Sequence, residues 1–246
     1  MVEVTFSLWS ADPIEADNNT YVITHGYMSS SSQDWVGDLA QEIDQRDPLS
    51  NIILTDWSEE ADTLNYFNAV ADTEAVGNQL ALWLNDSGVN PDTTQLIGHS
   101  LGAHVSGIAG DVYDDITGRS IETIVGLDPA GPAYEDTFFS SGKPLSERLD
   151  ASDADRVVAL HTSETFGYDD PLGILDLYIN PDDWFQPGEW NALGNHGYAH
   201  DLYADLVGGE KYRQSSSQSL GDGLFDYGDI FTFSGSIDVD TTEPFG

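Results

Sequence analysis

The sequence contains no cysteine, and only 7 of its 246 residues are lysine or arginine, against 44 aspartates and glutamates. Without cysteine the chain can form no disulfide, no thiolate nucleophile and no thiolate metal site. The formal net charge of −37 argues against nucleic acid as a partner, because phosphate binding needs basic side chains that displace counterions. A compact body with this charge repels itself unless ions screen it. We therefore expect a setting rich in salt or in calcium.

Long apolar runs are also absent, and a membrane-spanning helix needs about 20 such residues in a row. We therefore expect no transmembrane segment. The first ten residues lack the basic and then apolar pattern of a secretory signal, so either a signal was removed or export uses another route. With 39% hydrophobic residues the chain can bury a sizeable core, and its length favours one domain over residues 1–246. Residues 214–223 read as a surface loop, and residues 234–246 as a frayed tail or an edge strand.

Short β-branched runs alternate with longer helix-like stretches, which predicts an α/β fold with a mostly parallel central sheet and helices on both faces. The strands are expected at residues 2–8, 20–24, 52–56, 94–97, 121–127, 156–161 and 174–178. One helix should begin at Gln33 or Asp34 and end at Asp47, because a residue that precedes a proline avoids helical dihedrals. A second helix should run from Tyr66 to Leu84 and end before Gly88.

A serine stands between the strand at 94–97 and a helical stretch, in the pattern Gly-His-Ser-Leu-Gly over residues 98–102. This is the G-x-S-x-G elbow in the strand-turn-helix context that it requires. The turn strains the serine, and a side chain at either glycine would collide with the neighbouring strand or helix. The hydroxyl then lies at a helix N-terminus, where amides and the helix dipole favour an oxyanion. We predict that Ser100 is a nucleophile.

A serine nucleophile needs a histidine to take its proton and a carboxylate to orient that histidine. In elbow hydrolases these follow in the order serine, acid, histidine. Asp128 comes directly after the strand at 121–127, at the sheet edge where open α/β sheets hold their active sites. Three of the six histidines follow Asp128, and on spacing alone each can be the base: His161, His196 and His200.

Several motifs in fixed order resemble those of the pancreatic lipase family, which includes secreted phospholipases A1. They are THGY at 24–27, DW at 34–35, the strand 51–57, GHSLGAH at 98–104, GLDPAGP at 126–132, RLDASDA at 148–154, LHT at 160–162, DLY at 176–178 and QPG at 186–188. The resemblance spans roughly residues 20–207 and implies an α/β-hydrolase fold.

Carried over residue by residue, the resemblance makes Ser100 the nucleophile and Asp128 the acid. It places the oxyanion hole at the backbone amides of Tyr27 and Leu101. The segment from Asn195 matches the family's NH-x-R motif best with His196 as the base. His200 stays an alternative, because Tyr198 stands in place of the motif's arginine.

The other histidines are then expected to be structural. His161 is expected to be a packed strand residue, and His25 and His99 to support the oxyanion loop and the elbow. His104 follows Ser100 by four residues and should share one face of its helix.

Two departures from the family concern lipid contact. Only residues 189–194 separate Gly188 from the Asn195-His196 pair, where family lipases have a long lid. A lid covers an acyl groove in water, so its near absence predicts weak activation at interfaces and resembles the short-lidded phospholipases. The family's C-terminal lipid-binding domain has no counterpart in the sequence either. Trp184, Phe185 and Trp190 are then candidates for an aromatic rim that contacts lipid, the other interpretation being packing within the core or a loop.

The resemblance also implies a calcium site in the loop at 148–153. The Arg148 carbonyl, Asp150 and Asp153 match oxygen ligands of the kind that calcium prefers. The family's glutamate ligand falls on Leu145, so a solvated acidic loop is the other interpretation. No cofactor is otherwise required.

The resemblance therefore implies a carboxylic-ester hydrolase that releases fatty acids from glycerolipids, either triacylglycerols or phospholipid sn-1 esters, at a membrane or emulsion surface outside the cell. Two other hypotheses stay open. One is a catalytically silent acidic lipid-binding or storage protein on the same fold, and the other is a calcium-stabilised, adhesin-like module.

Overall fold

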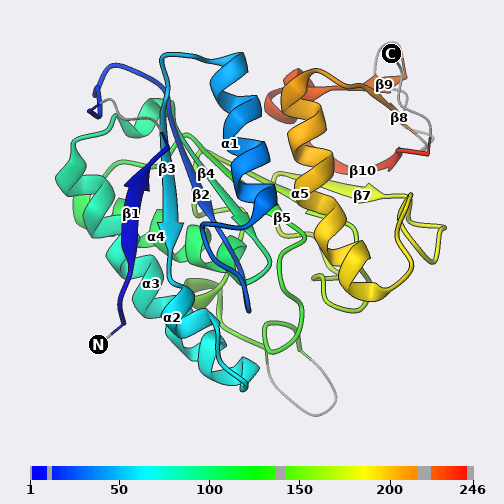
Figure 1. Ribbon diagram of the computed structural model, residues 1–246, viewed down its shortest axis with the longest axis horizontal. Helices are drawn as coiled ribbons and strands as arrows, with labels where there is room; N and C mark the ends of the chain where they lie inside the picture. Colours follow the sequence, from blue (N-terminus) through cyan, green and yellow to red (C-terminus); the bar gives the residue numbers. More distant parts are fainter. Residues whose placement is uncertain (1, 10–12, 137–141, 215–222, 243–246) are drawn as a thin grey trace.

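A ten-stranded sheet forms the centre of the computed structural model, which describes residues 2–9, 13–136, 142–214 and 223–242 (Figure 1). The order across the sheet is β1-β3-β2-β4-β5-β6-β7-β10-β8-β9. The strands from β3 to β10 in this order run parallel, whereas β1, β8 and β9 are antiparallel to their neighbours. The strands are β1 Thr5–Leu8, β2 Thr20–Thr24, β3 Asn51–Asp56, β4 Thr94–His99, β5 Thr123–Leu127, β6 Arg156–His161, β7 Leu175–Ile179, β8 Tyr212–Gln214, β9 Leu224–Phe225 and β10 Gly235–Asp240.

Helices cover both faces of the sheet, because alternate strand residues point to opposite sides. Val22 of β2 packs into the cluster that contains α3 and α4, while the next residue, Ile23, packs into the cluster that contains α1 and α5. Figure 1 shows α1 and α5 side by side on one face. The helices are α1 Asp34–Arg46, α2 Ser58–Ala61, α3 Tyr66–Ser87, α4 Leu101–Thr117 and α5 Ala192–Gly208, with 3-10 turns at Pro91–Thr93, Leu145–Glu147 and Tyr227–Phe231. The predicted α/β architecture is confirmed, and it is the α/β-hydrolase arrangement.

The ends of the two predicted helices agree closely with the sequence signals. The first ends at Arg46, before Asp47-Pro48, and the second continues three residues past Leu84. Gly88 then takes the left-handed conformation with φ +72°, which glycine adopts without a steric penalty.

The C-terminal segment corrects one prediction. Gly235–Asp240 form β10, which pairs in parallel with β7 and in antiparallel fashion with β8, so these residues are neither frayed nor an edge strand. Ile237 and Val239 alternate with polar residues and point into the core, which fixes the strand inside the sheet. The predicted loop lies mostly outside the described residues, as do residues 243–246. The prediction of a single domain stays a prediction.

None of the helices in the described ranges combines the length and the apolar character needed to cross a membrane. The parallel strands end at one edge of the sheet, and the candidate site residues follow β2, β4, β5 and β6 at that edge.

Candidate active site

Ser100 lies at the sharp turn between β4 and α4 in a strained conformation, with φ +57° and ψ −122°. Such values cost energy for a residue with a side chain and persist only where the surrounding structure enforces them. The side chain is 6% exposed, next to the N-terminus of α4. The strand-turn-helix elbow expected from the sequence is therefore present.

The two elbow glycines allow this turn for the reason expected. A Cβ added to Gly98 would lie 2.1 Å from the Gly102 carbonyl oxygen at the start of α4. A Cβ added to Gly102 would lie 2.3 Å from the Thr24 carbonyl oxygen at the end of β2. Both contacts are to backbone, which cannot move aside cheaply. Each glycine is therefore fixed by close approach of the main chain, on opposite sides of Ser100.

Asp128 follows β5 directly and is fully buried. Its Oδ2 accepts a hydrogen bond of 2.5 Å from His196 Nδ1. Its Oδ1 accepts backbone N–H bonds from Thr162 (2.7 Å) and Ser163 (3.1 Å), which follow β6. Three donors therefore hold this carboxylate, and His196 presents Nδ1 to it with Nε2 left for another partner. In a catalytic triad the acid orients its histidine through the same kind of hydrogen bond.

His200, the alternative base, lies elsewhere. Its Nδ1 bonds with Asp201 Oδ1 at 2.7 Å, and its ring stacks on Trp35 with the ring centroids 4.7 Å apart. The structure therefore brings His196 and not His200 to Asp128. The helix α5 sets this choice, because the two histidines are one turn apart and only the first reaches the acid.

The elbow is tied to both partners through backbone contacts. Ser100 N donates to Leu127 O (3.1 Å), and Ala130 N donates to Ser100 O (3.3 Å), which fixes the serine beside the loop that carries Asp128. His99 Nε2 donates to the His196 carbonyl oxygen at 3.0 Å. The hydrogen bonds within the described residues include none from the Ser100 hydroxyl to His196. Catalytic hydrogen bonds are often long in proteins without substrate and tighten when it binds.

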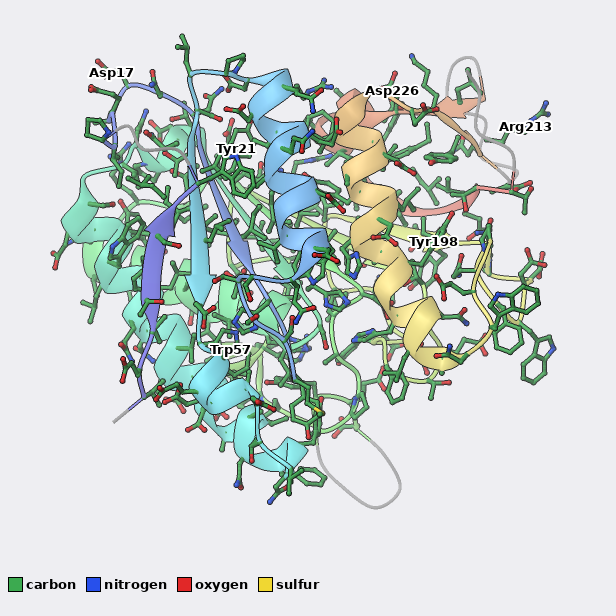
Figure 2. The ribbon with its side chains drawn as sticks, viewed as in Figure 1. Asp17, Tyr21, Trp57, Tyr198, Arg213 and Asp226 are labelled. Atoms are coloured by element: carbon green, nitrogen blue, oxygen red, sulfur yellow. The ribbon has the colours of Figure 1, made fainter. Side chains whose placement is uncertain are left out.

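The Tyr27 and Leu101 amides occupy positions suited to an oxyanion hole. Leu101 is the first residue of α4, where an N–H group has no partner within the helix. Within the described part of the chain, neither amide donates a backbone hydrogen bond. The Tyr27 loop is held by His25, whose Nε2 accepts from Trp57 N (3.1 Å) while its carbonyl accepts from Trp57 Nε1 (2.8 Å). Figure 2 shows Trp57 beside the end of β3.

The remaining histidines are structural, as expected. His104 Nδ1 accepts from Leu149 N (3.1 Å) and its Nε2 donates to Ala130 O (2.8 Å), while burial lowers its pKa to about 3. Burial also lowers the pKa of His25 and of His99. His161 bonds with Asp176 Oδ1 (3.0 Å) and with the Tyr168 carbonyl (2.8 Å).

Sequence analysis did not predict two kinds of contact at the site. The first is the pair of amides, at Thr162 and Ser163, that hold Asp128. The predicted neighbouring strands at 121–127 and 156–161 were the available signal, because parallel neighbours end at the same edge. The second is the His161–Asp176 pair, for which the sequence offers no local signal because 15 residues separate its members.

The predicted calcium residues lie in one loop whose polar groups bond mainly with each other. Asp150 Oδ1 accepts from Ser152 N (2.8 Å) and from its hydroxyl (2.6 Å), and Asp153 Oδ2 accepts from Asp150 N (2.8 Å). The Arg148 guanidinium donates to Leu149 O, and Leu145 is 56% exposed. Among the described residues no group of three or more acidic or histidine side chains is arranged to hold a metal ion. The calcium site at Arg148, Asp150 and Asp153 stays a prediction.

Asp153 nevertheless leads to a prediction about pH. Burial, helped by Asp150 and Asp111, raises its pKa to about 8 from the ordinary value of 3.8. The folded state then binds a proton that the unfolded state releases, so this group costs stability progressively as the pH rises from about 4 to 8. We expect Asp153→Asn to raise the free energy of unfolding at pH 9 by on the order of 3 kcal/mol and to change little at pH 3.5.

Thermal melts of the two proteins across this pH range measure the effect. Equal melting temperatures at pH 9 would contradict it. The same melts with added calcium test the ion, which should raise the melting temperature of the wild type and not of the variant if Asp153 is a ligand.

The connection before α5 is short, and exposed aromatic side chains lie in it and just before it. Three residues, 189–191, join Gly188 to the helix. Trp184, Phe185 and Trp190 are 89%, 47% and 84% exposed, so they do not pack in the core. Leu193 in the first turn of α5 is also exposed, at 69%.

A second set of exposed apolar side chains, in the segments between β2 and α1 and at the start of α3, contains Met28, Leu64 and Phe67. It is joined to the oxyanion loop, because the Tyr27 hydroxyl donates to Thr63 O and the Tyr27 ring packs edge-on against Tyr66 at 5.2 Å. Exposed apolar side chains are therefore found both beside the start of α5 and next to the Tyr27 loop.

Known proteins are similar to this chain in sequence. The profile of the family named Lipase matches residues 10–199. Lipase member H of Xenopus tropicalis is 36% identical over 173 residues, which cover 68% of this chain and 35% of that protein. Lipoprotein lipase of Rattus norvegicus is 36% identical over 182 residues, which cover 70% of this chain and 36% of that protein. The chain thus spans about a third of the length of these curated relatives.

Solved structures similar in fold are more distant in sequence. The protein Est1E from Butyrivibrio proteoclasticus is 15% identical with a TM-score of 0.45, over 83% of this chain and 90% of that one. The family match covers most of the chain and includes the elbow, Asp128 and His196. The chain therefore belongs to the Lipase family.

Proposed function

We propose that the protein is a serine carboxylic-ester hydrolase that releases fatty acids from glycerolipids. The observation that carries the proposal is the 2.5 Å bond between Asp128 and His196 beside the strained Ser100 elbow. The backbone N–H groups of Tyr27 and Leu101, which have no backbone partners in the described residues, supply the proposed oxyanion hole. Family membership provides independent support, because the relatives are named lipases.

In the proposed reaction, the Ser100 hydroxyl attacks the acyl carbonyl and its proton passes to His196 Nε2. Asp128 stabilises the imidazolium, and the Tyr27 and Leu101 amides hold the oxyanion of the tetrahedral intermediate. The alcohol leaves with the proton of His196. Water then attacks the acyl-enzyme with His196 as base, which releases the fatty acid.

A lipid surface is the substrate phase that the surroundings of the site favour. The exposed groups at 184–193 and at Met28, Leu64 and Phe67 can bury apolar area in a lipid layer. The net charge of −37 opposes an anionic surface at low salt, because repulsion acts over a Debye length of about 10 Å at 0.1 M. We therefore propose neutral or zwitterionic lipid surfaces as the target, and an extracellular, saline setting.

A matched pair of leucines tests the contact with lipid. Leu193 lies beside the site and is 69% exposed, whereas Leu49, at the opposite ends of the strands, is 75% exposed. We expect Leu193→Ala to weaken binding to phosphatidylcholine vesicles by about fivefold. Truncating a leucine that is buried in the lipid layer removes roughly 1 kcal/mol or more of binding free energy. Leu49→Ala should bind as the wild type does. Sedimentation with vesicles measures the affinity of both variants. Equal affinities would refute the proposal that the lipid contacts the protein beside the site.

Fatty-acid release from emulsified triolein and from phosphatidylcholine, at low and molar salt, tests the activity. A fluorophosphonate that labels active serines, located by peptide mass spectrometry, supplies a readout independent of the lipid chosen. We expect release from at least one lipid and labelling at Ser100. No release from either lipid and no labelling would instead support a catalytically silent lipid-binding protein. The ratio of the two rates decides between triacylglycerol lipase and phospholipase A1.

A further inference from the structure

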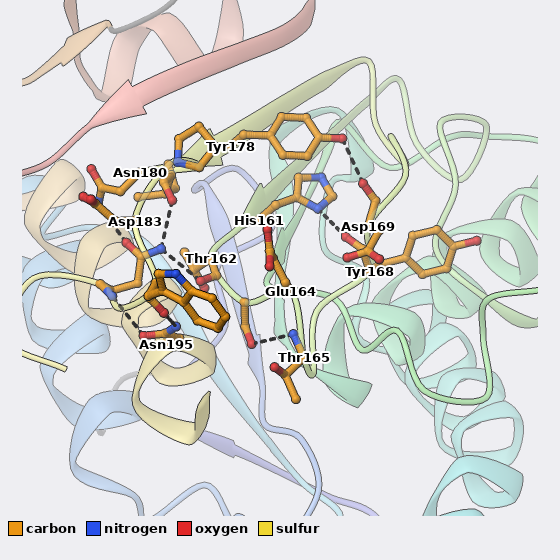
Figure 3. A pocket seen from close by; sticks show the side chains of 15 residues that line it. His161, Thr162, Glu164, Thr165, Tyr168, Asp169, Tyr178, Asn180, Asp183 and Asn195 are labelled. Carbon is orange, nitrogen blue, oxygen red and sulfur yellow. Dashed lines mark hydrogen bonds between the residues drawn. The ribbon is translucent and has the colours of Figure 1, made fainter. Parts of the chain in front are cut away.

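A cavity of about 470 Å³ opens between the loops that follow β6 and β7 (Figure 3). This volume lies within the range of small-ligand pockets. The cavity is separate from the serine elbow, and the proposed reaction uses none of its side chains. Its walls come from the ends of two neighbouring parallel strands, the edge at which open α/β sheets bind ligands.

The cavity shares a wall with the proposed catalytic acid. Thr162 and Ser163 line it, and their amides are the two that donate to Asp128 Oδ1. Asn195, which also lines it, is the residue before His196. Ser100 follows β4 and Thr162 follows β6, two strands away, so roughly 10 Å separate these strand ends at the usual spacing.

Buried side chains fix the shape of the wall. Gln186 is 4% exposed, and its amide donates to Thr162 O and to Ile179 O, both at 2.9 Å, which joins the ends of β6 and β7. Asn180 is 5% exposed and donates to Gln186 Oε1 at 2.7 Å. Gln186 N in turn donates to Asn195 Oδ1 at 2.9 Å. The cavity is therefore a built feature that needs no rearrangement to form.

The lining is acidic. Glu164, Asp169 and Asp183 line the cavity, and its described lining contains no lysine or arginine. Burial raises the pKa of Asp169, and the charges of Glu164 and Asp170 raise it further because these carboxylates lie near each other. The nearby Arg148 guanidinium lies over the ring of Tyr168, 5.3 Å from its centroid, and that ring points away from the cavity in Figure 3. His161 bonds with Asp176, so the pair adds no net positive charge.

The kind of cation follows from two further features. These carboxylates belong to no group in the described residues that is arranged to hold a metal ion, so a small inorganic cation lacks its ligand shell. Trp184 lines the cavity with 89% of its side chain exposed, a large ring that nothing covers. Tryptophan is the best aromatic partner for an organic ammonium, and carboxylates at a distance add to the attraction.

We propose that this cavity binds the quaternary ammonium of a choline headgroup and so selects choline glycerophospholipids among the substrates of the site. The proposal rests on the proposed function for its lipid context. The acyl carbonyl and the ammonium of such a lipid are separated by glycerol, phosphodiester and ethylene units, so the headgroup extends well beyond the ester that reacts at Ser100. The ammonium enters between Trp184 and the carboxylates, while the phosphodiester stays in water. An anionic headgroup would meet three carboxylates and no cation in the lining.

Binding of soluble phosphocholine to the full chain carrying Ser100→Ala tests the proposal without any hydrolysis. Isothermal titration at constant ionic strength gives the dissociation constant, with glycerol 3-phosphate as the anionic comparison and methyl galactoside as the neutral one. We expect saturable binding of phosphocholine alone. Trp184→Ala or Asp183→Asn should each weaken it by about fivefold or more, the size of one exposed cation–π or charge contact.

Neighbouring residues supply the controls. Trp190 is 84% exposed but does not line the cavity, and Asp182 precedes Asp183 without lining it. Trp190→Ala and Asp182→Asn should therefore leave the dissociation constant unchanged. All four side chains are exposed, so the variants should fold, which a thermal melt checks.

The possible results separate the pocket from the activity. Three results would overturn the proposed choline pocket, whatever the enzyme hydrolyses. They are no binding of phosphocholine, an equal loss of affinity in the test and control variants, or tighter binding of either comparison molecule. If phosphocholine binds through Trp184 and no ester is cleaved, the pocket stands and the proposed hydrolysis fails. If both hold, Trp184→Ala should lower release from phosphatidylcholine relative to triolein.

Discussion

Ser100→Ala is expected to reduce fatty-acid release by about 10⁴-fold or more, because removing a triad serine leaves only the catalysis that binding and the oxyanion hole provide. Alanine keeps the Cβ and therefore the same backbone conformation with φ +57°. The loss should therefore come from the missing hydroxyl and not from a change of fold.

Initial rates on the better of the two lipids, with thermal melts of each protein, measure this effect. Ser120→Ala is the control, because that serine is half-buried between α4 and β5, 20 residues after the elbow serine, and within the described residues its hydroxyl makes one long bond, of 3.4 Å, to Ile121 O. Its rate should equal that of the wild type. Retention of more than about 1% of the rate by Ser100→Ala would mean that another group is the nucleophile.

His196→Ala should lower the rate by a similar factor, about 10⁴-fold, while His200→Ala lowers it by far less. The two histidines lie one turn apart on α5, so the pair is closely matched in position. His196 alone bonds with Asp128, whereas His200 bonds with Asp201 and stacks on Trp35. Loss of His200 removes a ring contact near the site and leaves the proton path intact.

The same assay on lipid measures both variants, with added imidazole as a second readout. A small external base can partly replace a missing proton acceptor but cannot repair a packing defect. We therefore expect imidazole to raise the rate of His196→Ala and not that of His200→Ala. The reverse pattern would assign the base to His200.

The elbow and the acid could be predicted because their signals are local. Gly98, Ser100 and Gly102 lie within five residues, and their steric requirement depends only on the strand before and the helix after them. Asp128 could be predicted from its place at the end of an apolar strand. The choice of His196 needed the family resemblance, since spacing alone left three histidines open.

The rest of the site depends on which strands become neighbours. Asp128 is held by amides that follow β6, and His161 finds Asp176 on β7, contacts between segments that are distant in sequence. The position of β10 was mispredicted for the same reason. Its acidic, sparsely apolar sequence reads as a tail, and only its pairing with β7 places Ile237 and Val239 in the core.

The place of β10 also sets an order of assembly. The strands from β3 to β7 can join the sheet as the chain leaves the ribosome, because each pairs with a strand already made. The hairpin of β8 and β9 is synthesised earlier than β10, yet it reaches the sheet only through that strand. Until residues 235–240 emerge, β7 offers its free N–H and C=O groups at an open edge. A chain that stops before residue 235 should therefore pair with other chains through β7 and aggregate.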